Sequence, residues 1–219
     1  MHQPNFPRRQ SGFTLIEIAI VLVIIGLLLG GILKGQELIN NARVKNLASD
    51  FRNIPVFIYG YQDKFKSLPG DDSAASTHLT NAINATTPGV AADRGNGVIN
   101  GNWNSTTKTD ESFLFWQHVR LAGLAPGSTD INAADFLPVN AVGTMVGIQS
   151  AAPFTGMNSG TYYICSGGIS GKFAKQLDTQ LDDGITNKGS MVAGAAANAN
   201  TAGIAALDDA TNYIVCMGI

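Results

Sequence analysis

One carboxylate stands in an otherwise uncharged apolar run near the N-terminus. Between Phe13 and Leu33 the only ionisable residue is Glu17. An ionised carboxylate inside a membrane span costs about 2.5 to 3.5 kcal/mol on insertion scales, and such groups persist when they are paired. No basic residue lies within one helical turn of Glu17, so its partner would be a new α-amino group, created by a cut between Gly12 and Phe13. A helix cannot easily fold its first amine back onto that carboxylate, which predicts pairing between neighbouring molecules.

The apolar run is long enough to cross a bilayer. As a helix, residues 13–33 extend for about 31 Å, close to the thickness of the hydrocarbon core. Arg8 and Arg9 precede the run, and the positive-inside bias therefore predicts a single pass with a cytoplasmic N-terminus. A secretory signal peptide is the other interpretation of such a segment. It is disfavoured because the run exceeds a typical h-region and no A-x-A cleavage site follows it.

The residues around the expected cut resemble a known export signal. The stretch from Arg8 to Glu17 reads RRQSGFTLIE and leads into the apolar run. It resembles the signal of type IV prepilins and type II secretion pseudopilins. The resemblance implies that residues 1–12 are a leader removed by a prepilin peptidase, that Phe13 is N-methylated, and that Glu17 meets the N-terminal amine of a neighbour.

The same resemblance implies the partners and the location. Before assembly the chain would lie in inner-membrane lipid. It would then bind an assembly platform and join sister subunits in a periplasmic or cell-surface filament. Three segments also resemble parts of minor-pilin-like heads: residues 68–71 (LPGD), residues 111–112 (ES) and residues 181–184 (LDDG).

An amphipathic stalk is expected to continue the helix over residues 34–66. Apolar residues recur there at alternating spacings of three and four, which places them on one stripe. A coiled-coil partner could cover such a stripe, but a spine packed against a head domain is favoured because a long body follows. The stripe comprises Val44, Leu47, Phe51, Ile54, Ile58, Tyr61 and Phe65.

Residues 67–219 are expected to form a globular head outside the cytoplasm. The turn at Pro69-Gly70 ends the helix. Further helices are predicted over residues 111–122, capped by Asp110, and over residues 172–182. Strands are predicted over residues 142–149, 161–165 and 213–216. The predicted fold class is α+β, in which the long N-terminal helix packs on a small antiparallel sheet.

The two cysteines fit an exported head. Cys165 and Cys216 each end a predicted strand, and in an oxidising compartment they are expected to pair. The closed loop of 52 residues would contribute about 4 kcal/mol in the chain-entropy treatment. Two separate buried thiols are the alternative.

No metal site or cofactor is evident from the spacing of the acids. The only candidates for calcium ligands are two acidic pairs, Asp182 with Asp183 and Asp208 with Asp209. Oxygen donors of this kind suit calcium, although surface acids that cap loops give the same pattern. The notion of calcium in the head comes from the family resemblance.

Charge and motifs argue against other functions. From residue 67 to residue 219 there are 6 basic and 12 acidic residues, a net charge of −6 that disfavours nucleic acid as a partner. Hydrolase, zinc-protease, phosphate-loop and CxxC motifs are missing, so the chain is predicted not to be an enzyme. The predicted function is the one that the resemblance of residues 8–17 implies, a pilin or pseudopilin subunit of a type IV pilus-like or type II secretion filament. The alternative is a binding or catalytic domain for which residues 13–33 are only an anchor; surface pilus and secretion pseudopilus, major and minor subunit, all stay open.

Overall fold

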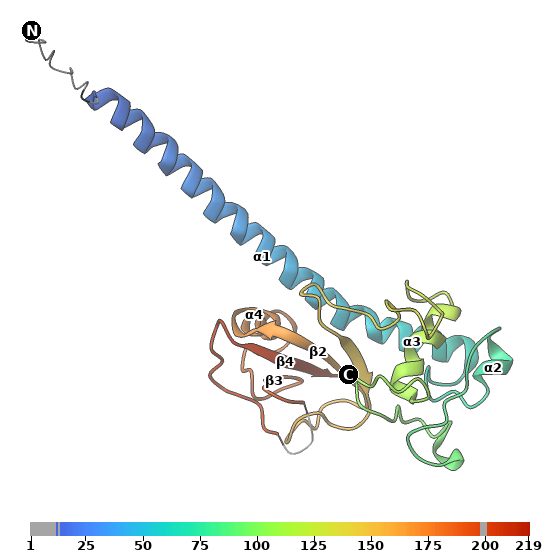
Figure 1. Ribbon diagram of the computed structural model, residues 1–219. Helices are drawn as coiled ribbons and strands as arrows, with labels where there is room; N and C mark the ends of the chain where they lie inside the picture. The colour runs from blue at the N-terminus through green and yellow to red at the C-terminus, as the bar shows by residue number, and fades with distance from the viewer. Residues whose placement is uncertain (1–11, 13, 198–200) are drawn as a thin grey trace, which may run out of the picture. The chain divides into compact units, whose positions relative to one another are not determined.

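The protein has the expected α+β fold, seen in a computed structural model that describes residue 12, residues 14–197 and residues 201–219 (Figure 1). The chain divides into a unit up to Ala42 and a unit from Arg43 to Ile219. The elements are α1 (Leu15–Phe65), α2 (Ala75–His78), a 3-10 turn (Ala91–Asp93), α3 (Glu111–Leu121), β1 (Val146–Gln149), β2 (Tyr163–Ser170), α4 (Gly171–Leu181), β3 (Met191–Gly194) and β4 (Asn212–Gly218).

In the first unit, the described residues form the beginning of α1, and their apolar side chains lie uncovered. One window of 18 residues in α1 has a mean hydropathy of 2.9, and none of it is buried. Leu27 and Leu33 are 73% and 67% exposed. A helix of this length and composition is suited to cross a membrane, which fits membrane anchoring.

In the second unit, α1 presents the predicted stripe to a protein core. Six of the seven stripe residues are buried, and Phe65 is half-buried against the ring of Tyr61, at 4.6 Å between ring centroids. Ala48 is a further buried residue of this face. The core that receives the stripe also contains side chains of α3 and of the sheet, such as Phe115 and Ile164.

The sheet has four antiparallel strands in the order β1-β2-β4-β3. Figure 1 shows β4 between β2 and β3, with α4 beside them. β1, β2 and β4 fall where strands were predicted. Their bounds differ from the prediction: β1 begins at Val146 rather than at residue 142, β2 continues to Ser170 rather than ending at residue 165, and β4 is longer by one residue at its start and two at its end. Strand β3 was not predicted at all.

Both predicted helices of the head are present as α3 and α4. Asp110 occupies the N-cap position of α3, but its side chain makes no capping bond. Its carboxylate instead accepts hydrogen bonds from the hydroxyls of Thr87 and Ser105, at 2.5 and 2.6 Å. The expectation of a side-chain cap was therefore wrong, because loop hydroxyls compete for the same carboxylate.

Candidate functional site

Thr14 and Glu17 form a reciprocal cap at the start of α1. The Thr14 backbone N–H donates to Glu17 Oε2 at 2.8 Å, and the Thr14 hydroxyl donates to the same oxygen at 2.7 Å. The Glu17 backbone N–H lies 3.3 Å from Thr14 Oγ1. Because α1 begins at Leu15, this is a capping box, in which the first and fourth residues satisfy each other's free backbone N–H groups. The Thr-x-x-Glu spacing in the sequence is the signal that predicts it, and it was overlooked.

The cap leaves the charge of Glu17 without a counter-ion. Within the part of the chain that the structure describes, no cation forms an ion pair with Glu17. Gly12 is exposed, and nothing lies within 4 Å of the position that a Cβ would occupy there. Phe13, the predicted site of cleavage and methylation, lies outside the described residues, as do residues 1–11 of the predicted leader.

The disulfide is present and lies in the middle of the sheet. Cys165 on β2 and Cys216 on β4 are bonded and directly opposite each other in the register. Gly147 on β1 and Val192 on β3 extend the same row across all four strands. The prediction of a disulfide is therefore confirmed, and the alternative of two separate thiols is wrong.

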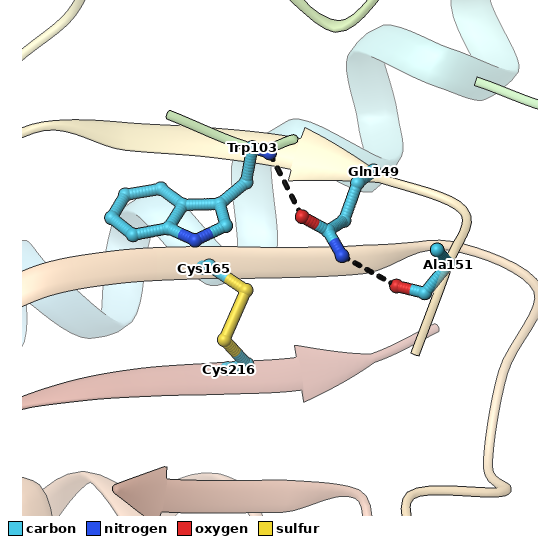
Figure 2. The surroundings of a disulfide bond; sticks show 5 residues. All are labelled: Trp103, Gln149, Ala151, Cys165 and Cys216. Atoms are coloured by element: carbon cyan, nitrogen blue, oxygen red, sulfur yellow. Dashed lines mark hydrogen bonds between the residues drawn. A yellow bond between two sulfur atoms is a disulfide. The ribbon is translucent and has the colours of Figure 1, made fainter. Parts of the chain in front are cut away.

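Trp103 packs against this row (Figure 2). Its backbone N–H donates to Gln149 Oε1 at 2.8 Å, and Gln149 Nε2 donates to the carbonyl of Ala151 at 2.6 Å. A Cβ at Gly147 would come within 1.9 Å of the Trp103 carbonyl oxygen, so only glycine fits beneath it. A loop residue far from the strands in sequence thus closes one face of the sheet over the disulfide.

The predicted acidic pairs separate into two places. Asp182 and Asp183 come together with Asp178, a residue that the sequence reasoning missed; their carboxylate oxygens lie within 4.8 Å of one another. Asp178 is buried, and this burial raises its pKa to about 6. Oxygen ligands of this kind could hold a hard cation.

The same carboxylates already accept hydrogen bonds that stabilise the loop after α4. Asp182 accepts hydrogen bonds from the Ser190 hydroxyl and the Met191 backbone N–H, at 2.8 and 2.9 Å. Asp178 Oδ1 accepts from the Gly184 N–H at 2.8 Å. These bonds tie the end of α4 to the start of β3. Calcium binding here stays a prediction that nothing in the fold requires.

Asp208 and Asp209 are not part of that group within the described residues. Asp208 Oδ1 accepts the backbone N–H groups of Ala210 and Thr211, and these bonds hold the pKa of Asp208 below its usual range. Asp209 forms an exposed ion pair with Lys175 at 2.9 Å. Both residues therefore act as loop caps or surface partners in this fold.

A buried polar cluster joins the turn after α1 to α3, and the sequence reasoning did not foresee it. Asp72 accepts hydrogen bonds from the Tyr61 hydroxyl at 2.8 Å and lies 2.7 Å from His78 Nδ1. Asp71 accepts from the Gly97 N–H at 2.8 Å, and Glu111 accepts from the Asn100 N–H at 2.7 Å. Asp71 and Glu111, from two of the three segments that resemble minor-pilin-like heads, thus hold the loop over residues 95–100 in place.

His118 and Gly70 complete this junction. The Gly70 N–H donates to His118 Nδ1 at 2.9 Å, which leaves the proton of the ring on Nε2, 2.9 Å from the Ile83 carbonyl oxygen. Burial lowers the pKa of His118, so the ring stays neutral. Gly70 has a φ of +89°, and a Cβ there would lie 2.3 Å from the Glu111 carbonyl oxygen. His118 is thus a fully buried residue whose two ring nitrogens both have hydrogen-bond partners.

Glu111 should make the head less stable as the pH rises. The residue is fully buried, and this burial raises its pKa from 4.5 to about 7 against the opposing hydrogen bond from Asn100. The folded protein therefore keeps a proton that the unfolded chain loses near pH 4.5. The resulting stability is complete below that pH and disappears by about pH 7, a change of up to about 3 kcal/mol.

Glu111→Gln tests this prediction. Glutamine keeps an acceptor for the Asn100 N–H and carries no charge, so the variant should be more stable than the parent at pH 8 and nearly equal at pH 4. The measurement is urea unfolding of the detergent-solubilised protein at both pH values. Asp209→Asn, which removes an exposed carboxylate, is the matched control and should leave the pH dependence unchanged. A parent and a Glu111→Gln variant that lose stability equally between pH 4 and pH 8 would contradict the assignment.

Comparison with known proteins assigns the N-terminal segment. Residues 7–33 match a family profile described as the prokaryotic N-terminal methylation motif. No curated protein and no solved structure matches the chain. The segment with Gly12, Phe13 and Glu17 is therefore a type IV prepilin-like signal. It supports a processed pilin-like or pseudopilin-like subunit and suggests a structural role rather than an enzymatic one.

Proposed function

We propose that this chain is a structural subunit, a pilin or pseudopilin, of a type IV pilus-like or type II secretion filament. The prepilin peptidase removes residues 1–12 on the cytoplasmic side, and the exposed amine of Phe13 is methylated. Glu17 then pairs with the N-terminal amine of a neighbouring copy while the apolar helices pack together. The observation that carries this proposal is the methylation motif over residues 7–33, which contains the single carboxylate of the apolar run.

The uncovered surface of α1 supports assembly by helix packing. Apolar side chains are exposed around the whole helix before Arg43, for example Leu22 at 64%, Val23 at 63% and Ile24 at 51%. In the membrane, lipid chains cover this apolar surface. Once the subunit leaves the bilayer, only the helices of other copies can keep it from water. Extraction into a filament is therefore coupled to packing against sister subunits.

The proposed route begins in the inner membrane, with the N-terminus in the cytoplasm. Lys34 and Glu37, which form an exposed ion pair at 2.7 Å, are the first charged residues after Glu17. They mark the outer boundary of the span. An assembly platform then transfers the subunit into a periplasmic or cell-surface filament. The Cys165–Cys216 disulfide supports this location, because disulfides persist in oxidising compartments.

Mass spectrometry of the intact protein tests the processing step. The chain should be recovered from membranes without residues 1–12 and with one methyl group on the amine of Phe13. In cells that lack the prepilin peptidase, the same chain should retain Met1 and carry no methyl group. A Gly12→Glu variant offers a second control, since a bulky charged residue before the cut should block removal of the leader.

A mature protein that begins at Met1 in cells with an active peptidase would exclude this function. That result would favour the alternative, in which the span only anchors an extracytoplasmic binding domain. A second sign of the alternative would be normal function when residues 13–33 are replaced by an unrelated apolar helix.

A further inference from the structure

A pocket whose wall contains the carboxylate of Asp50 opens beside α1 in the unit that begins at Arg43. It has a volume of about 240 Å³, and its walls come from α1, from α3 and from the loops around residues 125 and 138. Most of the wall is apolar: Phe57, Trp116 and Pro126 contribute to it. The volume is below the roughly 300 to 1,000 Å³ of small-molecule sites, so one long side chain is a better match in size than a metabolite.

Asp50 lies in this pocket without a partner. Its side chain is half-buried, and no described residue forms a hydrogen bond or an ion pair with its carboxylate. Burial alone raises the pKa of Asp50 to about 6. The carboxylate is therefore largely ionised at neutral pH, in surroundings that disfavour a charge. Such a group is stabilised by a cation that enters the pocket.

The one cation in the pocket wall is already committed elsewhere. Arg120 donates to the carbonyl oxygens of Pro126 and Ser128, at 3.0 and 2.9 Å. Its guanidinium also lies 5.1 Å from the centre of the Phe136 ring. Arg120 therefore stabilises its own loop. It does not counter the rise in the pKa of Asp50 that burial causes.

Free cations occur on α1 itself. Arg43, Lys45 and Arg52 are exposed, and none forms an ion pair with any described residue. Lys45 precedes Asp50 by five residues, which places the two side chains about 140° apart around the helix. Lys45 of the same chain is therefore on the wrong face of α1 to enter the pocket. A neighbouring copy can bring it there.

The proposed pairing between the Phe13 amine and Glu17 predicts which cation of the neighbouring copy can reach the Asp50 pocket. When the amine of Phe13 in one copy meets Glu17 of another, the two parallel helices are offset by four residues, or about 6 Å. In the same register along α1, Asp50 stands level with residue 46 of the neighbour, one residue from its Lys45. The apolar stem of a lysine can lie along the Phe57 and Trp116 walls while its ammonium reaches the carboxylate.

We infer that the Asp50 pocket is a docking site for Lys45 of a neighbouring copy of this chain. The contact would set the stagger between subunits at the level of the head, as the amine of Phe13 does in the membrane. This inference rests on the proposed function, because it requires the copies to assemble in parallel.

Charge exchange tests the contact in cells that assemble the full chain. Asp50→Lys and Lys45→Asp should each lower the yield of sheared filaments at least about tenfold, which corresponds to about 1.4 kcal/mol per contact. The double variant should recover most of the yield, because the pair is restored with its signs reversed. Asp63→Lys is the matched control: it changes a carboxylate of the same helix whose side chain is 91% exposed and which does not line the pocket.

Cysteine crosslinking gives a second readout that does not depend on yield. Copies with Asp50→Cys and copies with Lys45→Cys are expressed together, and filaments are treated with a bis-maleimide, whose spacer replaces the length of the lysine side chain that a disulfide could not bridge. A crosslinked dimer that needs both variants supports the contact. Its absence from intact filaments overturns the inference, even where Asp50→Lys fails because the head is misfolded.

The outcomes separate this inference from the proposed function. Normal filaments from Asp50→Lys, or a double variant no better than either single variant, would overturn the docking site and leave the proposed function intact. A loss caused by Asp50→Lys but not by Lys45→Asp would assign the pocket to a cation from another source, and would also overturn the inference. A parent chain that forms no filament would reject both.

Discussion

Glu17→Gln is expected to leave membrane insertion and leader removal intact while stopping the chain from entering filaments. The apolar span is unchanged, so insertion should proceed as in the parent, and the cut between Gly12 and Phe13 does not involve this side chain. The unpaired charge that we propose drives association is gone, however. Because an unpaired carboxylate in a span costs about 2.5 to 3.5 kcal/mol, removing this drive should lower incorporation by at least about tenfold per subunit.

The structure dictates the choice of glutamine over alanine. Glu17 also caps α1 through Thr14, and glutamine serves that role in a capping box. Glu17→Ala removes the cap and the charge together, so its effect has two explanations. Glu17→Gln removes the charge alone.

Thr14→Ala is the matched control for the cap. It removes the hydroxyl that contacts the Glu17 carboxylate at 2.7 Å and keeps the charge. The start of α1 should lose about 1 kcal/mol, and filaments should still form. The readouts are membrane abundance, the mass of the mature chain and the yield of sheared filaments. Filaments that form normally from Glu17→Gln but fail from Thr14→Ala would assign the residue to helix capping.

Loss of the disulfide is expected to destabilise the head by about 4 kcal/mol, the second large effect. The double variant Cys165→Ala with Cys216→Ala frees a loop in which the two cysteines are separated by 51 positions. In the chain-entropy treatment that loop accounts for the stated loss. Both cysteines are fully buried, so alanine also leaves space beneath Trp103. Urea unfolding of parent and variant measures the difference.

A reducing agent provides a control that leaves the sequence unchanged. Reduced parent protein should resemble the double variant in stability. Met191→Ala, which removes a buried side chain from the neighbouring β3, separates a general loss of packing from loss of the crosslink: its stability should respond to reduction as the parent does. A parent equally stable in oxidised and reduced form would contradict the prediction.

The features that depend on nearby residues were predictable. The apolar run, Glu17 within it and the stripe that begins at Val44 can all be read from the residue types and spacings along one helix. The helix at Glu111–Leu121 was also predicted within one residue, because its apolar density and its terminal glycine are local signals. The Thr14–Glu17 cap is equally local, because its Thr-x-x-Glu spacing lies within four consecutive residues.

The features that depend on distant contacts were not predictable. Strand β3 lies in an Ala- and Gly-rich stretch, and it becomes a strand because β4 offers an unpaired edge to Met191–Gly194. Likewise, β2 extends past Cys165 because its later residues pair with Tyr213 and Asn212. Pairing partners of this kind override weak local propensity.

The sequence by itself determined where the chain can enter a membrane and which carboxylate has no nearby cation, and it predicts the cut between Gly12 and Phe13, because these properties depend on neighbours along one helix. Only the tertiary structure decided that Asp178 joins Asp182 and Asp183, that Glu111 is buried beside the Asp71 turn, and that Asp50 lies in a pocket where no described cation pairs with it. Burial and unpaired charge are properties of surroundings, and the surroundings of each of these acids come from segments distant in the chain.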